Sequence, residues 1–284
     1  FMSKSFIESS MKRYGKADTF VCKKIDYRKY TNHKSKEKND HFEYLFYIEL
    51  KDENEVVFES PLNYIGSKAK MTSLIKRNMP KEFNTFIDAF GGGFNVGINI
   101  SSKRIIYNDI NSFVSKLVES FSSTDTYQYI LFLKRIIKKF KLEPENAENF
   151  IKVRDFYNST PPQKRDPKLL YAVILYGYNQ QIRFNNVHDF NNPVGMRWFN
   201  DKVLEKMISF SRVIKEKNII FESKDYDELF YEADKKTFTY LDPPYMLTNG
   251  SYNDGKRGFL GWDINTEKRF FDFVDRLNDE AKPF

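Results

Sequence analysis

The sequence contains one cysteine, Cys22, and three scattered histidines without metal-ligand spacing, His33, His41 and His188. A single cysteine excludes an internal disulfide, as is usual for proteins of a reducing cytoplasm. Structural zinc sites need clustered cysteine or histidine, so we expect no metal. No apolar run approaches the roughly 18 residues that a membrane span requires, and no charged-then-apolar signal is present. We therefore expect a cytoplasmic protein that does not enter a membrane.

The sequence also lacks an excess of acidic over basic residues. Lysine and arginine number 46 against 39 acidic residues, which gives a net charge of +7. This moderate basic excess is consistent with a phosphate backbone as partner. The 284 residues are enough for one large α/β domain with an insertion, or for two domains.

The most informative stretch is residues 240–245, Tyr-Leu-Asp-Pro-Pro-Tyr, which follows an apolar, β-prone run. Open α/β sheets hold ligands at the carboxyl ends of their strands. The Asp242 carboxylate and a carbonyl in a stiff turn can accept two hydrogen bonds from one amino group, and Tyr245 can stack on a flat base. The alternative is a strand that ends in a Pro-Pro turn beside a core tyrosine.

A second motif, residues 86–97, indicates a strand, a glycine loop and the start of a helix. Glycine allows positive φ and close approach of a ligand to the backbone, and amide groups at a helix N-terminus favour anions. The spacing is not G-x-G-x-x-G. A second short strand ends at Asp109, about 20 residues after Asp88, where nucleotide-binding sheets hold ribose hydroxyls. Together these features predict a cofactor that contains a nucleoside.

These motifs carry a family resemblance. The chain resembles the Dam-type adenine-N6 DNA methyltransferases, the alpha-ordered D12 family, over residues 61–284. The matching motifs stand in the family's order at residues 61–68, 88–93, 108–111, 221–226 and 242–245.

The resemblance implies a fold and a reaction. The fold is α/β, a Rossmann-like sheet that binds S-adenosylmethionine. The reaction is direct methyl transfer to the exocyclic amine of an adenine that has flipped out of duplex DNA. Asp242 and the Pro243 carbonyl accept the amine's hydrogens, Pro244 stiffens the turn, and Tyr245 stacks on the adenine. No covalent intermediate is needed, so no cysteine nucleophile is needed.

The resemblance also implies how the cofactor is held. Asp109 holds the ribose, Asp225 the amino group of the cofactor's adenine, and Tyr226 lines that ring. Alternatively, Asp225 is a solvated surface residue, because its surroundings are acidic. The methionine part of the cofactor lies beside the glycine loop, and residues on the opposite side close the pocket. For Lys68 on that side, the alternative is an ordinary lysine at the start of a helix. These two walls comprise Asp88, Phe90, Gly91 and Gly93 on one side, and Tyr64 and Lys68 on the other.

Amides and an arginine alternate with apolar residues over 179–195, around a turn expected at 187–189. This stretch resembles the target-recognition hairpin of Dam-type enzymes. Asparagine pairs bidentately with adenine, and arginine with guanine, in the major groove of DNA. We predict Arg183, Asn185 and Asn191 as DNA-binding residues, with Arg197 as a reader or a phosphate contact. The alternative is that the polar side chains only make the hairpin rigid by bonding its own turn.

The chain organisation follows from these motifs. We expect an N-terminal β-rich extension over 1–60, the first half of the catalytic domain over 61–112, a target-recognition insertion over 113–205 and the second half of the catalytic domain over 206–284. Strands are expected at 21–27, 42–50 and 55–58, helices within 71–79, 113–140 and 270–277, sheet strands at 219–221 and 238–241, and a closing loop at 248–261.

The family's sheet continues with a fifth parallel strand and a closing pair, whereas this sequence stops where the fifth strand is due. We therefore expect a fragment, or a second chain that completes the sheet. Double-stranded DNA is the expected partner, and a cognate restriction endonuclease in a bacterium or phage is another.

Three other functions stay open. A nicotinamide oxidoreductase explains the glycine loop and Asp109 but not the Asp-Pro-Pro-Tyr motif. An RNA or protein methyltransferase shares the cofactor loop. A catalytically dead DNA-binding remnant would bind the cofactor without transferring its methyl group.

Overall fold

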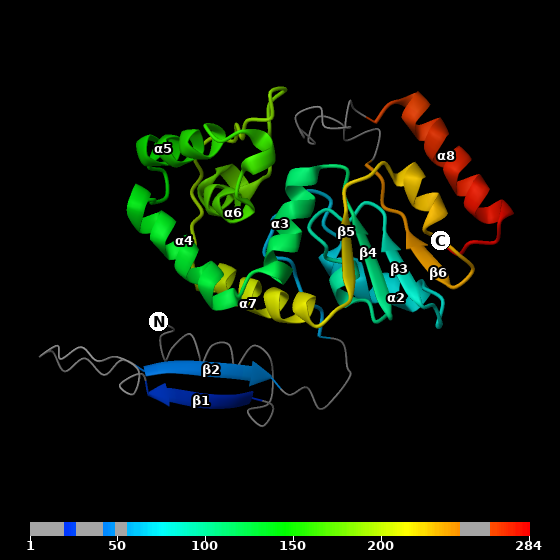
Figure 1. Ribbon diagram of the computed structural model, residues 1–284, viewed down its shortest axis with the longest axis horizontal. Helices are drawn as coiled ribbons and strands as arrows, with labels where there is room; N and C mark the ends of the chain where they lie inside the picture. The colour runs from blue at the N-terminus through cyan, green and yellow to red at the C-terminus, as the bar shows by residue number, and fades with distance from the viewer. Residues whose placement is uncertain (1–19, 27–41, 49–55, 245–261) are drawn as a thin grey trace, which may run out of the picture. The chain divides into compact units, whose positions relative to one another are not determined.

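The computed structural model describes residues 20–26, 42–48, 56–244 and 262–284 (Figure 1). The chain divides into two compact units, Phe1–Val56 and Val57–Phe284. In the first unit β1 (Phe20–Asp26) pairs antiparallel with β2 (Phe42–Ile48). The two N-terminal strands expected from the sequence are therefore present.

The prediction of a third strand at 55–58 is wrong for residues 56–58, which the structure describes. Val56–Phe58 lie outside any strand. The side chain of Asn99 accepts a hydrogen bond from the Phe58 amide at 2.7 Å and donates one to the Phe58 carbonyl at 2.8 Å. A side-chain amide thus takes the backbone groups that a neighbouring strand would have used.

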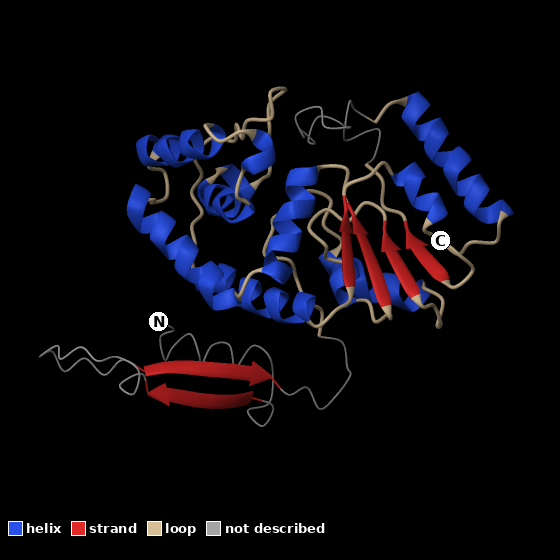
Figure 2. Ribbon diagram, viewed as in Figure 1, coloured by secondary structure: helices blue, strands red, loops and turns tan. Residues whose placement is uncertain are grey.

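A parallel sheet of four strands forms the centre of the second unit (Figure 2). Its strands are β3 (Thr85–Asp88), β4 (Arg104–Asn108), β5 (Ile219–Glu222) and β6 (Thr237–Tyr240). The order β5-β4-β3-β6 means that the chain moves outward from β3 and then returns to its other side. The strand order therefore reverses between β3 and β6, and the crevice at such a reversal is where open α/β sheets bind ligands.

Side chains alternate between the two faces of this sheet, as the pleat requires. Phe86, Ile105 and Tyr107 belong to one hydrophobic core, and Ile87 and Ile106 to another. All five are buried. Apolar residues of β3 and β4 therefore point to both faces, which is typical of a parallel sheet between two layers of helices.

The first core is shared with the helices that follow β4. α3 (Ser112–Ser123) packs against α6 (Pro167–Tyr176), α7 (Asp201–Lys215) and β5, while α4 (Thr126–Phe140) and α5 (Ala147–Asn158) pack against α6. The helices expected within 113–140 are confirmed. The stretch expected as an insertion shares its core with the sheet, and α7 runs across its expected end at 205.

The second core lies under α8 (Ile264–Asp279), with Phe270, Phe273 and Leu277 facing the sheet, and includes η7 (Tyr226–Tyr231). Beyond α8 the Pro283 carbonyl accepts a hydrogen bond from the Thr239 amide at 3.0 Å, beside β6. The remaining short helices are η3 (Ala69–Met71), α2 (Thr72–Asn78), η4 (Gly97–Asn99), η5 (Pro162–Lys164) and η6 (Tyr178–Gln180).

Among the described residues, no helix is long and apolar enough to cross a membrane. The same part of the chain contains no group of histidine, cysteine or acidic side chains that could hold a metal ion.

Candidate active site

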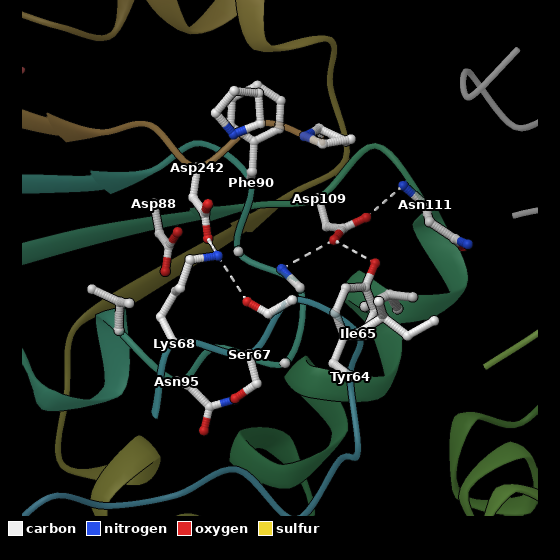
Figure 3. A pocket seen from close by; sticks show the side chains of 18 of the residues that line it. Tyr64, Ile65, Ser67, Lys68, Asp88, Phe90, Asn95, Asp109, Asn111 and Asp242 are labelled. Atoms are coloured by element: carbon white, nitrogen blue, oxygen red, sulfur yellow. Dashed lines mark hydrogen bonds and ion pairs between the residues drawn. The ribbon is translucent and has the colours of Figure 1, made fainter. Parts of the chain in front are cut away.

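A pocket opens at the carboxyl ends of β3, β4 and β6 (Figure 3). It therefore occupies the crevice that the reversal of strand order predicts. Of the residues predicted from the sequence, the pocket is lined by Tyr64, Lys68, Asp88, Phe90, Gly91, Gly93, Asp109, Asp242, Pro243 and Pro244. Tyr245 and the expected closing loop at 248–261 lie outside the described residues.

Asp88 ends β3 at the base of the pocket and is buried. Its Oδ2 accepts a hydrogen bond from the Gly97 amide at 3.2 Å. Burial is the main cause that raises the pKa of this carboxyl from 3.8 to about 7; the charges of Asp242 and Asp109 act in the same direction, and the hydrogen bond opposes them. A cation that entered the pocket would favour the ionised carboxylate.

Asp109 follows β4 and is also buried. Its Oδ2 accepts hydrogen bonds from the Gly92 amide at 3.0 Å and the Tyr64 hydroxyl at 3.4 Å, and its Oδ1 accepts from the Asn111 amide at 2.8 Å. These bonds fix the carboxylate at the rim of the pocket (Figure 3). A carboxylate held in this way suits a diol, which donates two hydrogen bonds.

The glycine loop approaches β4 closely. The Gly91 amide donates to the Asn108 carbonyl at 2.7 Å, and the Tyr107 hydroxyl donates to the Gly92 carbonyl at 2.8 Å. Gly92 has a φ of +48°, so the positive φ expected in this loop is confirmed. A Cβ at Gly91 would lie 2.3 Å from the Tyr107 ring, so only glycine fits.

The expected helix start after this loop is wrong. Phe94 has a φ of +63°, and the chain continues into the three-residue η4 (Gly97–Asn99). The Gly97 amide is bonded to Asp88, and the Gly92 amide to Asp109. Two amides of this stretch therefore bond carboxylates, and the loop does not form the anion site of a helix N-terminus.

Lys68 spans the pocket from the opposite wall. Its Nζ lies 2.6 Å from Oδ2 of Asp242 and donates to the Gly66 carbonyl at 2.9 Å. The two charged side chains are only 17% and 18% exposed, so solvent screens the pair weakly. Lys68 also directly precedes η3, so both of its expected positions, at a helix start and in the pocket, are observed. Pro243 and Pro244, which follow Asp242 in the chain, also line the pocket.

Asp225 and Tyr226 are absent from the residues that line this pocket. Asp225 caps η7, because its Oδ1 accepts from the Asp227 amide at 3.0 Å, and its Oδ2 is paired with Arg269 at 2.5 Å. Tyr226 is buried against Phe90, whose ring also faces the pocket. The ion pair with Arg269 is a contact that neither sequence interpretation of Asp225 included.

The hairpin expected within 179–195 is confirmed around residues 185–189. The Asn185 amide donates to the Asp189 carbonyl at 2.9 Å, and the Asn191 amide to the Arg183 carbonyl at 3.1 Å. The Asn185 Oδ1 accepts from the amides of Val187 and Asp189. Asn185 therefore makes the turn rigid, which is the alternative stated for these polar side chains.

The other predicted DNA-binding residues differ in exposure. Arg183 and Arg197 are exposed, whereas the Oδ1 atom of Asn191 is buried with no hydrogen-bond partner in the structure. The hairpin's two inward phenylalanines are fully buried: Phe184 stacks on Phe113 of α3 at 4.6 Å between ring centroids, and Phe190 meets Phe184 edge-on. The hairpin thus rests on the core while Arg183 faces solvent.

Several residues that shape the site had no individual role predicted from the sequence, although the motifs at 61–68 and 108–111 contain Ser67, Asn108 and Asn111. Asn108 bonds the Ala89 carbonyl and both backbone groups of Lys224 through its side-chain amide, and so ties β3 to the segment after β5. Ser67, Asn95, Asn111 and Ile182 line the pocket. Asn111 carried a signal, since asparagine before an apolar helical pattern indicates an N-cap, and its Oδ1 does accept from the Phe113 amide.

Three carboxylates and one lysine are the charged side chains that line the pocket in the described part of the chain. Such a pocket can accept a cationic ligand that also carries a diol. Asp242 and the carbonyl groups of a proline turn add acceptors for an amino group. The acceptor set therefore fits a cationic ligand with a diol on one side and an amino group on the other.

Comparison with known proteins identifies relatives that are DNA methyltransferases. A family model described as "D12 class N6 adenine-specific DNA methyltransferase" matches residues 64–284. The type II methyltransferase M.FokI of Planomicrobium okeanokoites is 35% identical over 98% of this chain and 45% of its own length. The modification methylase StsI of Streptococcus sanguinis is 33% identical over 100% of this chain and 46% of its own.

A DNA adenine methylase of Escherichia coli K12 is 27% identical over 68% of this chain and 66% of its own length. The chain spans less than half the length of M.FokI and StsI. The family model covers the four-stranded sheet, the pocket and the hairpin, while β1 and β2 lie before the matched residues. The chain belongs to the D12 class of N6 adenine-specific DNA methyltransferases.

Proposed function

We propose that this chain transfers a methyl group from S-adenosylmethionine to the exocyclic amine of adenine in duplex DNA, at a specific short sequence. The observation that carries the proposal is the convergence of Asp88, Asp109 and Asp242 on one pocket at the strand-order reversal. An oxidoreductase with a nicotinamide cofactor would leave Asp242 and its two prolines without a role.

The cofactor's binding residues follow from the contacts in the pocket. Asp109 accepts hydrogen bonds from the ribose hydroxyls, because the Gly92 and Asn111 amides hold its carboxylate in position at the rim of the pocket. Asp88 faces the cationic methionine part, which favours its ionised form. Gly91 and Gly93 keep the backbone close to the ligand, while Tyr64 closes the opposite wall.

Two further residues bind the cofactor's adenine in this proposal. Asp225 receives the amino group and Tyr226 lines the ring. Support for Tyr226 comes from Phe90, which lines the pocket and packs on Tyr226 at 5.4 Å between ring centroids. Because Arg269 pairs with Asp225, the amino group would have to share or displace that partner.

When bound, S-adenosylmethionine supplies an electrophilic methyl group on a sulfonium. Asp242 and the Pro243 carbonyl accept hydrogen bonds from the target amine, whose lone pair is otherwise delocalised into the adenine ring. Pro244 restricts the turn, so the acceptors need little reorganisation. Asp242 holds the proton that the amine releases on transfer. Tyr245 stacks on the adenine in this proposal.

The DNA side of the site is the hairpin. Arg183 and Arg197 are exposed cations that reach base edges or phosphates. Asn185 shapes the turn through its own backbone bonds, and Asn191 carries an unsatisfied buried acceptor beside it. A base stacked inside the duplex cannot reach Asp242, so the adenine must flip out.

The biological setting is part of the proposal. M.FokI, StsI and the LlaI methylase of Lactococcus lactis are named as type II or modification methylases. By likeness to them, this chain protects DNA against a cognate restriction endonuclease in the cytoplasm of a bacterium or of a phage-infected cell.

The test is transfer of a labelled methyl group from S-adenosylmethionine to unmethylated duplex DNA. Asp242→Ala should abolish transfer, because the amine loses a main acceptor, while cofactor binding persists. Asp227→Ala is the matched control, since this carboxylate lies in η7 and pairs with Arg276 away from the pocket. Equal transfer by wild type and Asp242→Ala would refute the role of the Asp-Pro-Pro motif.

A further inference from the structure

Arg165 is a buried arginine outside the pocket, with a side chain only 2% exposed. Its guanidinium group donates four hydrogen bonds. Nε donates to the Thr160 carbonyl at 2.8 Å, and Nη2 to the Asn158 carbonyl at 2.9 Å and to Oδ1 of Asp189 at 2.7 Å. Nη1 donates to the His188 carbonyl. Burying this charge costs free energy unless all these partners stay in place.

These partners belong to two different segments. Asn158 and Thr160 end and follow α5 (Ala147–Asn158), whereas His188 and Asp189 form the turn of the hairpin. Arg165 therefore joins the end of a core helix to the tip of the hairpin. Its guanidinium group also lies 5.1 Å from the Tyr157 ring centroid, within range of a cation–π contact.

A second contact holds the hairpin to the same helix end. The side-chain amide of Asn158 donates to the Phe190 carbonyl at 3.0 Å and accepts from the Phe190 amide at 2.9 Å. Asn158 thus pairs with the hairpin as a neighbouring strand would. The carbonyl of the same residue accepts from Arg165, so the two contacts form one network.

The network determines where the exposed side of the hairpin lies. Arg183, Asn186 and Val187 are exposed on the same hairpin, and Val187 is 67% exposed at its tip. Bidentate reading of a base edge depends on donor position, and a shift of about 1 Å can cost on the order of a hundredfold in rate. A tip held by backbone carbonyls and one carboxylate can keep its position when DNA approaches.

We propose that Arg165 is a positioning residue for target recognition, which acts through His188 and Asp189 on the hairpin and touches neither DNA nor cofactor. The inference rests on the proposed function, in which the hairpin reads DNA. Lysine cannot replace arginine here, because an ammonium group lacks the planar fork that reaches four acceptors at once.

The test compares wild type with Arg165→Lys and Asp189→Asn. Each protein methylates a duplex library with random sequence, and sequencing locates the N6-methyladenine positions, so the test works whatever the recognition sequence is. Thermal unfolding and the Kd for S-adenosylmethionine are measured for every variant. The matched control is Arg276→Lys, whose arginine also pairs with an aspartate and lies over a ring, Phe230, but sits on α8.

We expect Arg165→Lys and Asp189→Asn to lower the preference for the best sequence over its single-base variants at least tenfold. The Kd for the cofactor should change less than twofold, and Arg276→Lys should keep the wild-type preference. A folded Arg165→Lys protein with unchanged site preference would overturn this inference alone. Absence of any methylation by the wild type would overturn the proposed function, and this inference with it.

Discussion

The Nζ atom of Lys68 lies 2.6 Å from Oδ2 of Asp242, across the mouth of the pocket. The lysine comes from the segment before η3 and the aspartate from the segment that follows β6, so two distant parts of the sequence meet at the pocket. Asp242 also lies near Asp88, whose pKa it raises. Lys68 is thus the positive charge that balances a group of carboxylates.

Removal of this charge should slow the chemical step. We expect Lys68→Met to lower kcat by about tenfold to a hundredfold, because Asp242 loses the contact that holds it in position. Lys68→Arg should recover part of the rate, since it keeps the charge. Steady-state kinetics with separate KM values for DNA and cofactor provide the measurement. A Lys68→Met enzyme with wild-type kcat would contradict a positioning role.

The pKa of Asp88 predicts how stability depends on pH. The folded-state pKa is raised to about 7 from 3.8, so between these values the unfolded chain releases a proton that the folded chain keeps. Stability should therefore fall as pH rises through this window, by about 1.4 kcal/mol per pH unit from this group. Below and above the window the contribution should stay constant.

Asp88→Asn isolates this effect. Its side-chain oxygen can still accept from the Gly97 amide, which Asp88 bonds at 3.2 Å, but it cannot ionise. The difference in unfolding free energy between variant and wild type, from denaturant titrations at several pH values, should grow from pH 4 to 7 in the variant's favour. A difference that does not change with pH would show that Asp88 is ionised in the folded protein throughout.

The glycine loop should tolerate a methyl group at one position better than at another. At Gly91 a Cβ would lie 2.3 Å from the buried Tyr107 ring, whereas at Gly93 its nearest neighbours are 3.1 and 3.2 Å away. We expect Gly91→Ala to weaken cofactor binding more than tenfold and Gly93→Ala by a few-fold. Calorimetric titration with S-adenosylmethionine measures both, and equal affinities for the two variants would contradict the packing argument.

Asp225 gives a test of the cofactor's adenine contact. Asparagine at this position can still cap η7, but it loses the charge that pairs with Arg269. If Asp225 binds the adenine amino group, Asp225→Asn should weaken cofactor binding several-fold while Arg269→Met does not. The same loss of affinity in both variants would assign the effect to the ion pair instead.

The motif residues at strand ends could be predicted because their positions follow from local sequence. An apolar run that ends in an acid places that acid at the edge of a parallel sheet, and Asp88, Asp109 and Asp242 all line the pocket. Helical periodicity likewise predicted α3 and α4, whose apolar residues recur on one face.

What failed depends on contacts between distant residues. Val56–Phe58 have a strand-like sequence, but Asn99 bonds the backbone of Phe58. The glycine loop resembles a helix start, but Asp88 takes the Gly97 amide and Phe94 adopts a positive φ. Side-chain competition for backbone groups across about 40 residues has no local signature. The burial of Arg165, for which the sequence made no prediction, has none either.

The most direct test of the central claim is nucleoside analysis of DNA methylated by this chain. After reaction with S-adenosylmethionine, the duplex is digested and its nucleosides are separated and identified by mass. We predict N6-methyldeoxyadenosine as the methylated product, lost with Asp242→Ala. A methylated cytosine, or a methyl group on adenine that persists without Asp242, would contradict the claim that Asp242 and Pro243 hold an adenine amine for direct transfer.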